Sequence, residues 1–415
     1  MADHDSVHND VRPRTAVLTR GYDPRLSFGS ARPAVFRAAT YVFPSPEAAE
    51  QAFAITTGKI KPAPGDRADL IYSRFSHPNS EILEDQLVPL EPGATDAAVF
   101  NSGMAAIMTA LFAVLRPGAS VVHTTPLYGG TTGLMHFLEP WGVKVIPAPS
   151  GDSKALDKAI ASAKDCCAVL LETPANPTLI MTDIERAADS AARHPDRPPV
   201  MVDNTFLGPT FQHPLLLGAD VSLYSATKYL GGFSDILAGV AIGKSLDLIQ
   251  KMRNRRNMFG NILQPDECWL LNSRLPTVSL RMNRQSKNAQ RLAETLNGHK
   301  QLSRVIYPTL FTDPEQKRIF EKQCAYPGGL FSIDFKGGKT AAFDFLRNLQ
   351  IARSAVSLGG LETLTCHPKS TTHSGMTGPE LAESGVTDGL VRISVGIEDW
   401  RDLLADFEQA LAAIE

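Results

Sequence analysis

The sequence predicts an α/β protein with a mainly parallel sheet, helices on both of its faces, and a smaller C-terminal α+β domain. Between about residues 67 and 247, short apolar and β-branched runs alternate with helical stretches. Such alternation is typical of parallel sheets, whose strands are joined by crossover helices. After residue 270 one long amphipathic stretch and more widely spaced strands replace the alternation, which indicates a second unit.

The local sequence pattern predicts the individual strands and helices. Strands of the main sheet are predicted at 120–123, 143–146, 168–171, 199–203, 221–224 and 238–242. Further elements are a helix at 281–296, strands at 304–307, 330–335 and 390–395, and a closing helix at 400–414. We therefore divide the chain into an arm (1–66), a large domain (67–270) and a small domain (271–415), with an exposed loop at 58–65.

The charge and hydropathy patterns exclude several functional classes. The 41 Lys and Arg nearly balance the 44 Asp and Glu, so no global field would gather nucleic acid or an anionic membrane. The densest basic run, 253–256, is interpreted as a solvated helix face. The longest apolar run, near 104–115, is shorter than the roughly 20 residues that span a bilayer, and residues 1–10 are polar and acidic. We expect neither a membrane nor a nucleic-acid partner.

The cysteines point to a reducing compartment. There are five, and only Cys166 and Cys167 are adjacent. This spacing forms neither a disulfide framework nor a zinc site. We expect a cytoplasmic protein without a metal.

Lys228 is the first candidate for chemistry, because it lies just past an apolar strand and ahead of Gly231 and Gly232. An amine there can form a Schiff base with an aldehyde cofactor, while Ser225 and Thr227 can donate hydrogen bonds to a phosphate. The glycines let the backbone approach a cofactor closely. Taken alone, a lysine after a strand is more often a solvated loop charge.

Polar residues at other strand ends favour the functional interpretation, because ligands of open parallel sheets bind at the carboxyl ends of the strands. Asp203 follows the strand 199–203 and could keep a pyridine nitrogen protonated, although such residues often cap helices instead. Gly103 and Met104 open a helix after the apolar run 97–100, and a helix N-terminus can bind phosphate. An ordinary Ser N-cap is the alternative there.

Two loops offer contacts to a planar ligand. Tyr128 lies after a strand and could lie against a planar cofactor, or could simply be a buried tyrosine that fixes its loop. Asn176, in a loop with two prolines, is suited to bonding a ring hydroxyl oxygen, and a plain turn is the alternative.

Three further residues could bind anions. Tyr72 and Arg74 offer a phenol and a guanidinium as a phosphate clamp, although a surface salt bridge is the default for a single Arg. Arg392 lies inside an apolar strand, where a charge is costly unless it is paired. Either a ligand carboxylate or an internal Asp or Glu would explain it.

The combination of segments resembles the fold-type-I pyridoxal-phosphate enzymes of cysteine and methionine metabolism. This trans-sulfuration family includes cystathionine γ-synthase, cystathionine γ-lyase, methionine γ-lyase and O-acyl-homoserine sulfhydrylases. The resemblance runs from about Thr15 to the C-terminus. Its marks are Tyr72-Ser73-Arg74, Ser102-Gly103-Met104, Leu127-Tyr128-Gly129-Gly130, Glu172-Thr173-Pro174-Ala175-Asn176-Pro177, Asp203-Asn204-Thr205, Ser225-Ala226-Thr227-Lys228-Tyr229, Ser357-Leu358-Gly359-Gly360 and Arg392-Ile393-Ser394-Val395-Gly396.

The resemblance implies a seven-stranded sheet, pyridoxal 5'-phosphate as cofactor, and a role for each candidate. Lys228 would bind the cofactor covalently and shuttle the proton, Asp203 would pair with the pyridine nitrogen, and Tyr128 would stack on the ring and protonate the leaving group. The implied phosphate ligands are Gly103, Met104, Ser225 and Thr227, and the implied substrate-carboxylate ligands are Ser357, Arg392 and Asn176.

The resemblance also implies an oligomer. Tyr72 and Arg74 would reach the phosphate in the neighbouring subunit, and residues 1–66 would form an inter-subunit arm. The expected assembly is a homotetramer built from two active dimers.

Departures from the family members bear on the substrate. The cystathionine-handling enzymes would have an arginine at Gly133 and a glutamate at Val356, so the distal pocket is less polar here and a small group on the sulfur is favoured. Methionine γ-lyase would have a cysteine at Gly130 and a Lys-Asp pair at Arg256-Asn257. The segment between Phe53 and Asp69 is also longer, which would reshape the entrance.

The leading hypothesis is a carbon-sulfur lyase that carries out γ-elimination on methionine, homocysteine or a related amino acid. It would release a 2-oxo acid, ammonia and a thiol. The alternative within the family is γ-replacement on an O-acyl-homoserine. A nicotinamide-binding enzyme is disfavoured because no Gly-x-Gly-x-x-Gly follows the first strands. A non-catalytic binding protein is disfavoured by Lys228 together with Asp203 and Arg392.

Overall fold

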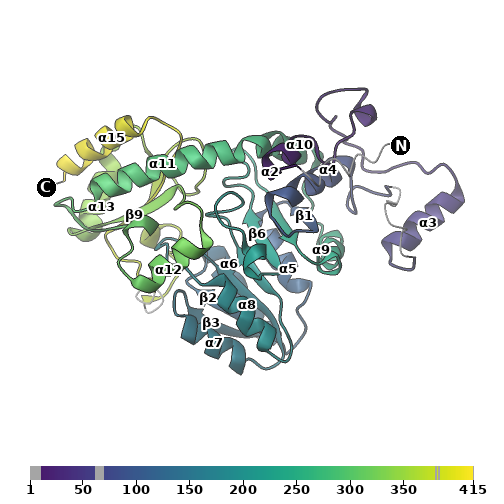
Figure 1. Cartoon of the computed structure of the whole chain (residues 1–415), viewed down its shortest axis with the longest axis horizontal. Coiled ribbons are helices and arrows are strands. Elements are labelled where there is room, and N and C mark those ends of the chain that lie inside the picture. Colours follow the sequence, from purple (N-terminus) through teal and green to yellow (C-terminus); the bar gives the residue numbers. More distant parts are fainter. Residues whose placement is uncertain (1–10, 61–69, 379–380, 382–383, 415) are drawn as a thin grey trace.

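The computed structural model describes residues 11–60, 70–378, 381 and 384–414, and its core is built around two sheets (Figure 1). The predicted features at residues 1–10, in most of the loop 58–65 and in most of the longer segment before Asp69 lie outside the described residues. The larger sheet has the order β1-β7-β6-β5-β4-β2-β3. Its strands are β1 (Asp96–Phe100), β2 (Ser120–Thr125), β3 (Lys144–Pro149), β4 (Cys166–Glu172), β5 (Val200–Asp203), β6 (Val221–Ser225) and β7 (Gly239–Gly243).

The predicted α/β class with a mainly parallel seven-stranded sheet is confirmed. Strands β3, β2, β4, β5 and β6 are each parallel to the next strand in this sheet order, whereas β7 pairs antiparallel with both β1 and β6. The direction of β7 depends on the long turn after β6. The carboxyl ends of β2, β4, β5 and β6 therefore share one edge, as the parallel pairing requires.

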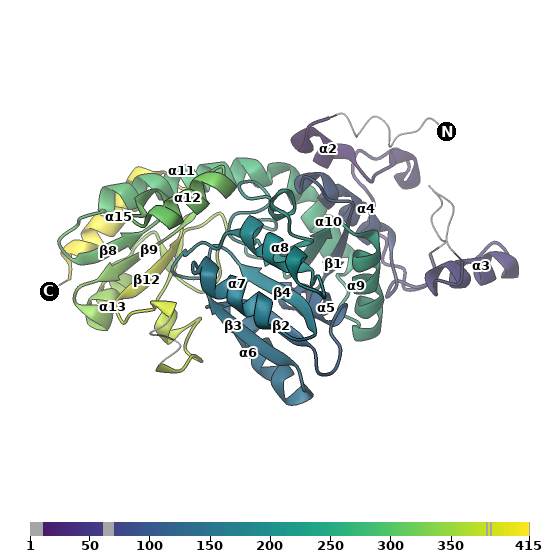
Figure 2. The ribbon, with the colours of Figure 1, turned by 60° about the horizontal axis from the view of Figure 1, so that its bottom comes forward.

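Helices cover both faces of the large sheet. The helices of this part are α4 (Pro78–Leu87), α5 (Gly103–Phe112), α6 (Gly129–Leu138), α7 (Ser153–Ser162), α8 (Ile184–Arg193), α9 (Leu246–Phe259) and α10 (Pro265–Arg274). Strand β4 shows why both faces must be covered. All of its residues are buried, and Leu170 packs with α5, α6 and α9, whereas Val169 and Leu171 pack with α7 and α8. Figure 2 shows α7 and α8 in front of the strands.

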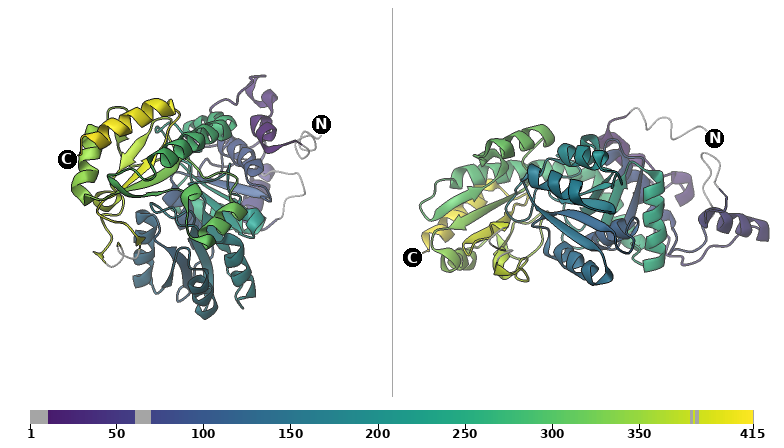
Figure 3. Two further views of the ribbon diagram at one scale, coloured as in Figure 1. Left: turned by 60° about the vertical axis from the view of Figure 1, so that its left-hand side comes forward. Right: turned by 90° about the horizontal axis from the view of Figure 1, so that it is seen from below.

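The C-terminal part folds around the second sheet, with the order β10-β11-β12-β9-β8. Its strands are β8 (Leu302–Ile306), β9 (Leu330–Phe335), β10 (Arg353–Ser354), β11 (Leu364–Cys366) and β12 (Leu390–Ser394), and its helices are α11 (Val278–Leu296), α12 (Pro314–Gln323), α13 (Gly338–Asn348) and α15 (Trp400–Ala412). The short strands β10 and β11 were not predicted, because two or three residues carry too little pattern. Figure 3 shows this part beside the large sheet, with the long helix α11 leading into it. The boundary predicted after residue 270 falls inside α10, and the division into domains stays a prediction.

The N-terminal arm contains α2 (Pro13–Thr19) and α3 (Pro46–Thr56). Its middle part is fastened to the large domain, since Arg37 forms an ion pair with Asp266 and the amide of Phe36 donates to Asn79 at 2.8 Å. Helix α3 stands apart from both sheets in all the views (Figures 1 to 3). Several large apolar side chains of the arm are solvent-exposed, namely Leu18, Leu26, Phe28, Val42 and Phe53.

The basic run 253–256 is not simply a solvated helix face, so that prediction was wrong in part. Arg256 is buried and binds Glu84 at 2.6 Å, and Arg253 contacts both Glu84 and Asp96. These ion pairs tie α9 to α4 and β1. The sequence could not show this, because the acidic partners lie far away in the chain.

Like Glu84, Glu91 is a buried acid, and it contacts Tyr224 of β6. It has no ion-pair partner among the described residues. Its Oε2 accepts a hydrogen bond from the hydroxyl of Tyr224 at 2.6 Å, and that hydroxyl also accepts from Ser222 and Asn204. Burial raises the pKa of Glu91 from 4.5 to about 8. The folded protein therefore holds this carboxyl in its neutral form at neutral pH.

We expect Glu91 to make the folded protein less stable as the pH rises from about 4.5 to 8. In that window the unfolded chain releases the Glu91 proton while the folded chain keeps it, so the free energy of unfolding falls. Glu91→Gln should remove on the order of 5 kcal/mol of this pH dependence. Urea unfolding at several pH values measures it, and parallel curves for both proteins would contradict the prediction.

Candidate active site

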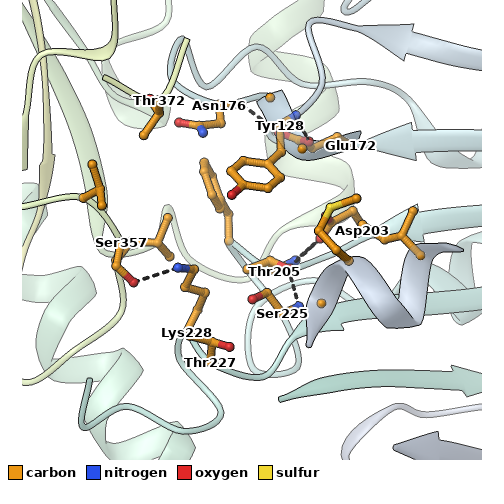
Figure 4. A pocket seen from close by; sticks show the side chains of 18 of the residues that line it. Tyr128, Glu172, Asn176, Asp203, Thr205, Ser225, Thr227, Lys228, Ser357 and Thr372 are labelled. Carbon is orange, nitrogen blue, oxygen red and sulfur yellow. Dashed lines mark hydrogen bonds between the residues drawn. The ribbon is translucent and has the colours of Figure 1, made fainter. Parts of the chain in front are cut away.

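A cavity of about 570 Å³ opens where the carboxyl ends of β2, β4, β5 and β6 meet the C-terminal part of the chain. Figure 4 shows side chains from both parts pointing into it. Most of the predicted site residues line this cavity: Gly103, Met104, Tyr128, Asn176, Asp203, Ser225, Thr227, Lys228, Ser357 and Arg392. The structure thus brings together residues that are up to 289 positions apart in the sequence, between Gly103 and Arg392.

Tyr72 and Arg74 are not among the residues that line the cavity. The Arg74 guanidinium donates to the carbonyl of Asn257 at 2.7 Å and lies over the rings of Tyr72 and Phe75. Tyr72 is 43% exposed. Within one chain these two side chains do not line the cavity, and their role in a neighbouring subunit stays a prediction.

Lys228 sits in a tight turn that follows β6. The amide of Gly231 donates to the carbonyl of Ala226, and the amide of Gly232 donates to the carbonyl of Lys228, both at 2.7 Å. Gly232 has a φ of +74° and lies against the Arg281 guanidinium, where any Cβ would clash. Arg281 in turn donates to the carbonyl of Tyr229 at 2.6 Å. The turn is therefore held from the side of α11.

The Lys228 amine points into the cavity and donates to the Ser357 hydroxyl at 2.7 Å (Figure 4). Burial, with a smaller contribution from the nearby Arg392 cation, lowers its pKa from 10.5 to about 8. A larger fraction of this amine is therefore neutral near pH 8 than for an ordinary lysine. A neutral amine is the nucleophilic form that attacks an aldehyde.

One end of the cavity is suited to a phosphate. The first amides of α5 have no partner within the helix, and the Ser102 side chain caps the helix by accepting from Ala105. Gly103 packs against Ser225 so closely that a Cβ would lie 2.7 Å from the Ser225 Cβ. The Thr227 hydroxyl bonds to the backbone of Ala238 and lies in the same wall.

Two carboxyl groups, Asp203 and Glu172, lie side by side at the floor of the cavity, since these residues are paired in register on β5 and β4. Asp203 Oδ1 accepts from the amide of Thr205 at 3.1 Å and from its hydroxyl at 2.5 Å. Burial raises the pKa of Asp203, and burial together with the Asp203 charge raises the pKa of Glu172 to about 8. Such a pair favours binding a cationic group between or beside the two carboxyls.

Arg392 forms the opposite wall and is 3% exposed. Its Nη1 donates to Asn176 Oδ1 at 3.2 Å and its Nη2 to the Ser357 carbonyl at 2.7 Å, whereas its Nε has no partner. No carboxylate of the described residues forms an ion pair with it. The internal Asp or Glu that could have explained this charge is therefore absent from the described part, which favours the alternative of a ligand carboxylate.

Several lining residues were not predicted for the site. Glu172 was noted only as part of a motif, and Thr205, Leu237, Thr371 and Thr372 received no role. Glu172 ends β4 as Asp203 ends β5, so its strand-end position was a usable signal. Leu237 and the two threonines come from loops, where the sequence pattern carries no directional information.

The positions at which this chain departs from the related enzymes do not all lie at the cavity. Gly130 and Val356 line the cavity, and Gly133 does not. Arg256 points into the buried ion cluster with Glu84, so its side chain is not directed at the cavity. The carbonyl of Asn257 contacts Arg74 instead.

Fold and site together bring a buried lysine with a lowered pKa, the N-terminus of a helix and a pair of carboxyl groups to one edge of an α/β sheet. The sequence model of the family described as Cys/Met metabolism PLP-dependent enzyme matches residues 14–412. The chain belongs to this family and is a pyridoxal-phosphate-dependent enzyme.

Individual relatives are similar over nearly the whole chain. A Pseudomonas putida protein named L-methionine gamma-lyase is 40% identical over 402 residues, which cover 96% of this chain and 97% of the relative. A Mycobacterium leprae protein named cystathionine gamma-synthase is 39% identical over 346 residues, 83% of this chain and 87% of the relative. A solved structure of a cystathionine gamma-lyase from Micromonospora echinospora has a TM-score of 0.87 at 34% identity and covers 97% of this chain and 99% of that one.

The cavity fits the cofactor of this family. Because Gly103 has no Cβ, it can pack directly against Ser225, and this brings the unpaired first amides of α5 close to the Ser225 side chain in the cavity wall, as a phosphate site requires. The exposed Tyr128 ring faces the cavity, the buried carboxyl of Asp203 is suited to a pyridine nitrogen, and the Lys228 amine is free to react with an aldehyde.

We expect the Lys228 amine of the cofactor-free protein to titrate near pH 8, and Arg392→Ala to move that midpoint upward, because removal of a nearby cation favours the charged ammonium. Competitive labelling of amines followed by mass spectrometry measures the midpoint. Arg401→Ala, at an exposed site in α15, is the control and should leave it unchanged. An unaltered midpoint in Arg392→Ala would contradict the assigned cause.

Proposed function

We propose that this enzyme catalyses γ-elimination on a sulfur amino acid such as methionine or homocysteine, and releases a 2-oxo acid, ammonia and a thiol. One observation carries the proposal. In a single cavity, the reactive amine of Lys228 faces an unpaired buried Arg392 across from the carboxyl of Asp203. The name of the Pseudomonas putida relative, L-methionine gamma-lyase, supports the same reaction.

The substrate carboxylate would bind at Arg392. The unpartnered Nε of this side chain and its two Nη groups can form charge-assisted hydrogen bonds to a carboxylate. Ser357 and Asn176, which already contact Arg392, would hold the same group. The α-amino group of the substrate is then directed toward Lys228, because Ser357 bonds to both residues.

Pyridoxal phosphate, when bound, supplies an electron-accepting ring that delocalises the negative charge left at the α carbon. The Asp203 carboxylate would hold the pyridine nitrogen in its protonated form. Lys228 would hold the cofactor through Nζ, and its amine would remove the proton from the α carbon of the substrate. A pKa near 8 suits this residue to take and return a proton.

Tyr128 would act on the leaving group. Its backbone amide is fixed by Glu172 at 2.7 Å, while its ring is 44% exposed and reaches into the cavity. The β carbon would also lose a proton, with the Lys228 amine as its acceptor once the first proton has been passed on, and the Tyr128 hydroxyl would protonate the departing sulfur. The stacked ring would also hold the cofactor plane.

The distal wall of the cavity favours an apolar substrate end. Leu237 and Val356 line the cavity, and 67% and 55% of their respective surfaces are exposed. A charged distal end, as in cystathionine, would find no charged partner on these two side chains. A thiol or a methyl thioether fits this surface better.

Replacement at the γ carbon of an O-acyl-homoserine is the second candidate. It is favoured by the Mycobacterium leprae relative, which is 39% identical and is named cystathionine gamma-synthase. The same residues would act in both reactions until the γ substituent leaves. Addition of sulfide or a small thiol, instead of water, would then give a thioether or a thiol amino acid.

We further propose a cytoplasmic homotetramer, built as a dimer of active dimers, in which the arm (1–66) crosses between subunits. The exposed apolar residues of the arm would be covered there, and Tyr72 and Arg74 would reach the phosphate of the neighbouring subunit. The large domain (67–270) would bind the cofactor, and the small domain (271–415) would complete the carboxylate site. No helix of the described residues is long and apolar enough to cross a membrane.

Lys228→Ala should lower the rate of 2-oxo acid release by at least about 1,000-fold, because no other group at that position can move the proton. In the unaltered enzyme, borohydride should bleach the cofactor absorbance and leave a pyridoxyl adduct on Lys228, which peptide mass spectrometry detects. Lys244→Ala, at an exposed position outside the cavity, is the matched control and should keep full activity. An adduct on another lysine would remove Lys228 from this role.

A substrate panel separates elimination from replacement. We expect methionine and homocysteine to yield 2-oxo acid, and cystathionine to react poorly. The panel should include cysteine and O-acyl-homoserines with and without sulfide. Val356→Glu should lower methionine turnover about tenfold by adding a charge beside the apolar end, whereas the control Val356→Leu should not. Thioether formation without 2-oxo acid would favour the second candidate.

A further inference from the structure

Glu172 is the one buried acid of the cavity that has no role in the proposed reaction. It ends β4, is 5% exposed and lies in register with Asp203 on the neighbouring strand. A second carboxyl beside Asp203 is costly, because both the burial and the like charge oppose its ionisation. An uncharged residue of equal size would avoid that cost. The hydrogen bonds that Glu172 accepts give a reason for a carboxyl group at this position.

Each carboxyl oxygen of Glu172 binds the backbone of a different loop. Oε2 accepts from the amide of Tyr128 at 2.7 Å, and Oε1 accepts from the amide of Asn176 at 3.0 Å. Figure 4 shows Glu172 next to Tyr128, with Asn176 on the same side of the cavity. One side chain thus joins the loop after β2 to the loop after β4.

Glutamate suits this position better than glutamine does. Both contacts need an acceptor, and a carboxyl group keeps acceptor capacity on both of its oxygens whether or not it is protonated, whereas an amide offers one oxygen and one NH₂ donor. Glutamine would therefore direct an NH₂ group at one of the two backbone amides. That conflict would separate one loop from β4.

The two loops carry the residues that act on opposite ends of the substrate. The Oδ1 of Asn176 accepts a hydrogen bond from Arg392 Nη1 at 3.2 Å. The Nη2 of Arg392 donates to the Ser357 carbonyl at 2.7 Å. Tyr128 lies at the other end of the same chain of contacts. Glu172 is therefore the point at which the carboxylate-binding group is connected to the tyrosine.

We propose that Glu172 is a positioning residue whose two carboxyl oxygens fix Tyr128 relative to Asn176, and thereby set the spacing between the leaving-group end and the carboxylate end of the site. This rests on the proposed roles of those two residues. Glu172 touches neither substrate nor cofactor in this role. It acts through the backbone of both loops.

The test compares Glu172→Gln with the unaltered holoenzyme in two measurements. In the first, kcat/KM for methionine should fall about 10- to 100-fold, as expected when a reacting group is displaced by about 1 Å. In the second, the dissociation constant of norleucine, which has a carboxylate but no sulfur, is measured from the change in cofactor absorbance. It should rise about tenfold, because Asn176 is released.

Double variants show whether the loss occurs through the two loops. If Glu172 acts through Tyr128, Tyr128→Phe combined with Glu172→Gln should lose less activity than the product of the single losses. Asn176→Ala should likewise weaken norleucine binding little further in the Glu172→Gln protein. Losses that multiply independently in both pairs would overturn the proposal.

Asp406→Asn is the matched control for a stability effect. Asp406 is also buried and accepts from three backbone amides, those of Gln350, Ile351 and Ala352, but it lies away from the cavity. We expect this variant to lower the melting temperature without changing norleucine binding or kcat/KM. If Glu172→Gln behaved in the same way, or stayed within twofold of the unaltered enzyme, the proposal would be wrong.

The proposed function can fail separately. If the unaltered enzyme turned over no sulfur amino acid, the assigned reaction would be wrong. Norleucine binding and the affinity of the apoenzyme for pyridoxal phosphate would still test whether Glu172 connects the two loops. A tenfold loss of norleucine affinity in Glu172→Gln, absent in Asp406→Asn, would support it in that case as well.

Discussion

The contacts of Arg392 hold the candidate site together, because they join its two halves. This buried cation has no ion-pair partner among the described residues and instead donates to Asn176 of the large sheet and to the carbonyl of Ser357 from the C-terminal part. Ser357 also accepts from Lys228. Arg392 and the Lys228 amine are thus connected through a single serine, and the Nε of Arg392 has no partner among the described residues.

Buried charged residues form ion pairs in one region of the protein, whereas those at the cavity form none among the described residues. Behind β1, Arg253 and Arg256 are neutralised by Glu84 and Asp96, and this cluster fastens helices to the sheet. At the cavity, no ion pair of the described residues joins Lys228 or Arg392 to a carboxyl, although Asp203 and Glu172 line the same cavity. Unpaired buried charges destabilise a fold, so their presence at one edge of the sheet indicates selection for ligand binding over stability.

Much of this arrangement could be predicted from the sequence, and the failures have physical causes. Lys228 and Asp203 were found because a strand end is visible as an apolar run followed by a polar residue. The strand β7 was predicted but its antiparallel direction was not, because pairing direction depends on partners far away in the chain. The strands β10 and β11 were missed, because two or three residues carry too little pattern. Arg256 was misread since its partner Glu84 lies 172 positions away.

The sequence by itself determined the fold class, the family and the residue types that surround the cofactor, because these depend on local periodicity and on motifs with fixed spacing. Only the tertiary structure decided which of these side chains meet. It placed Glu172 between Tyr128 and Asn176, left Arg392 without a carboxylate partner among the described residues, and set Arg74 against Asn257 outside the lining of the cavity. Such contacts depend on distances between separate strands and loops, and local sequence patterns do not encode those distances.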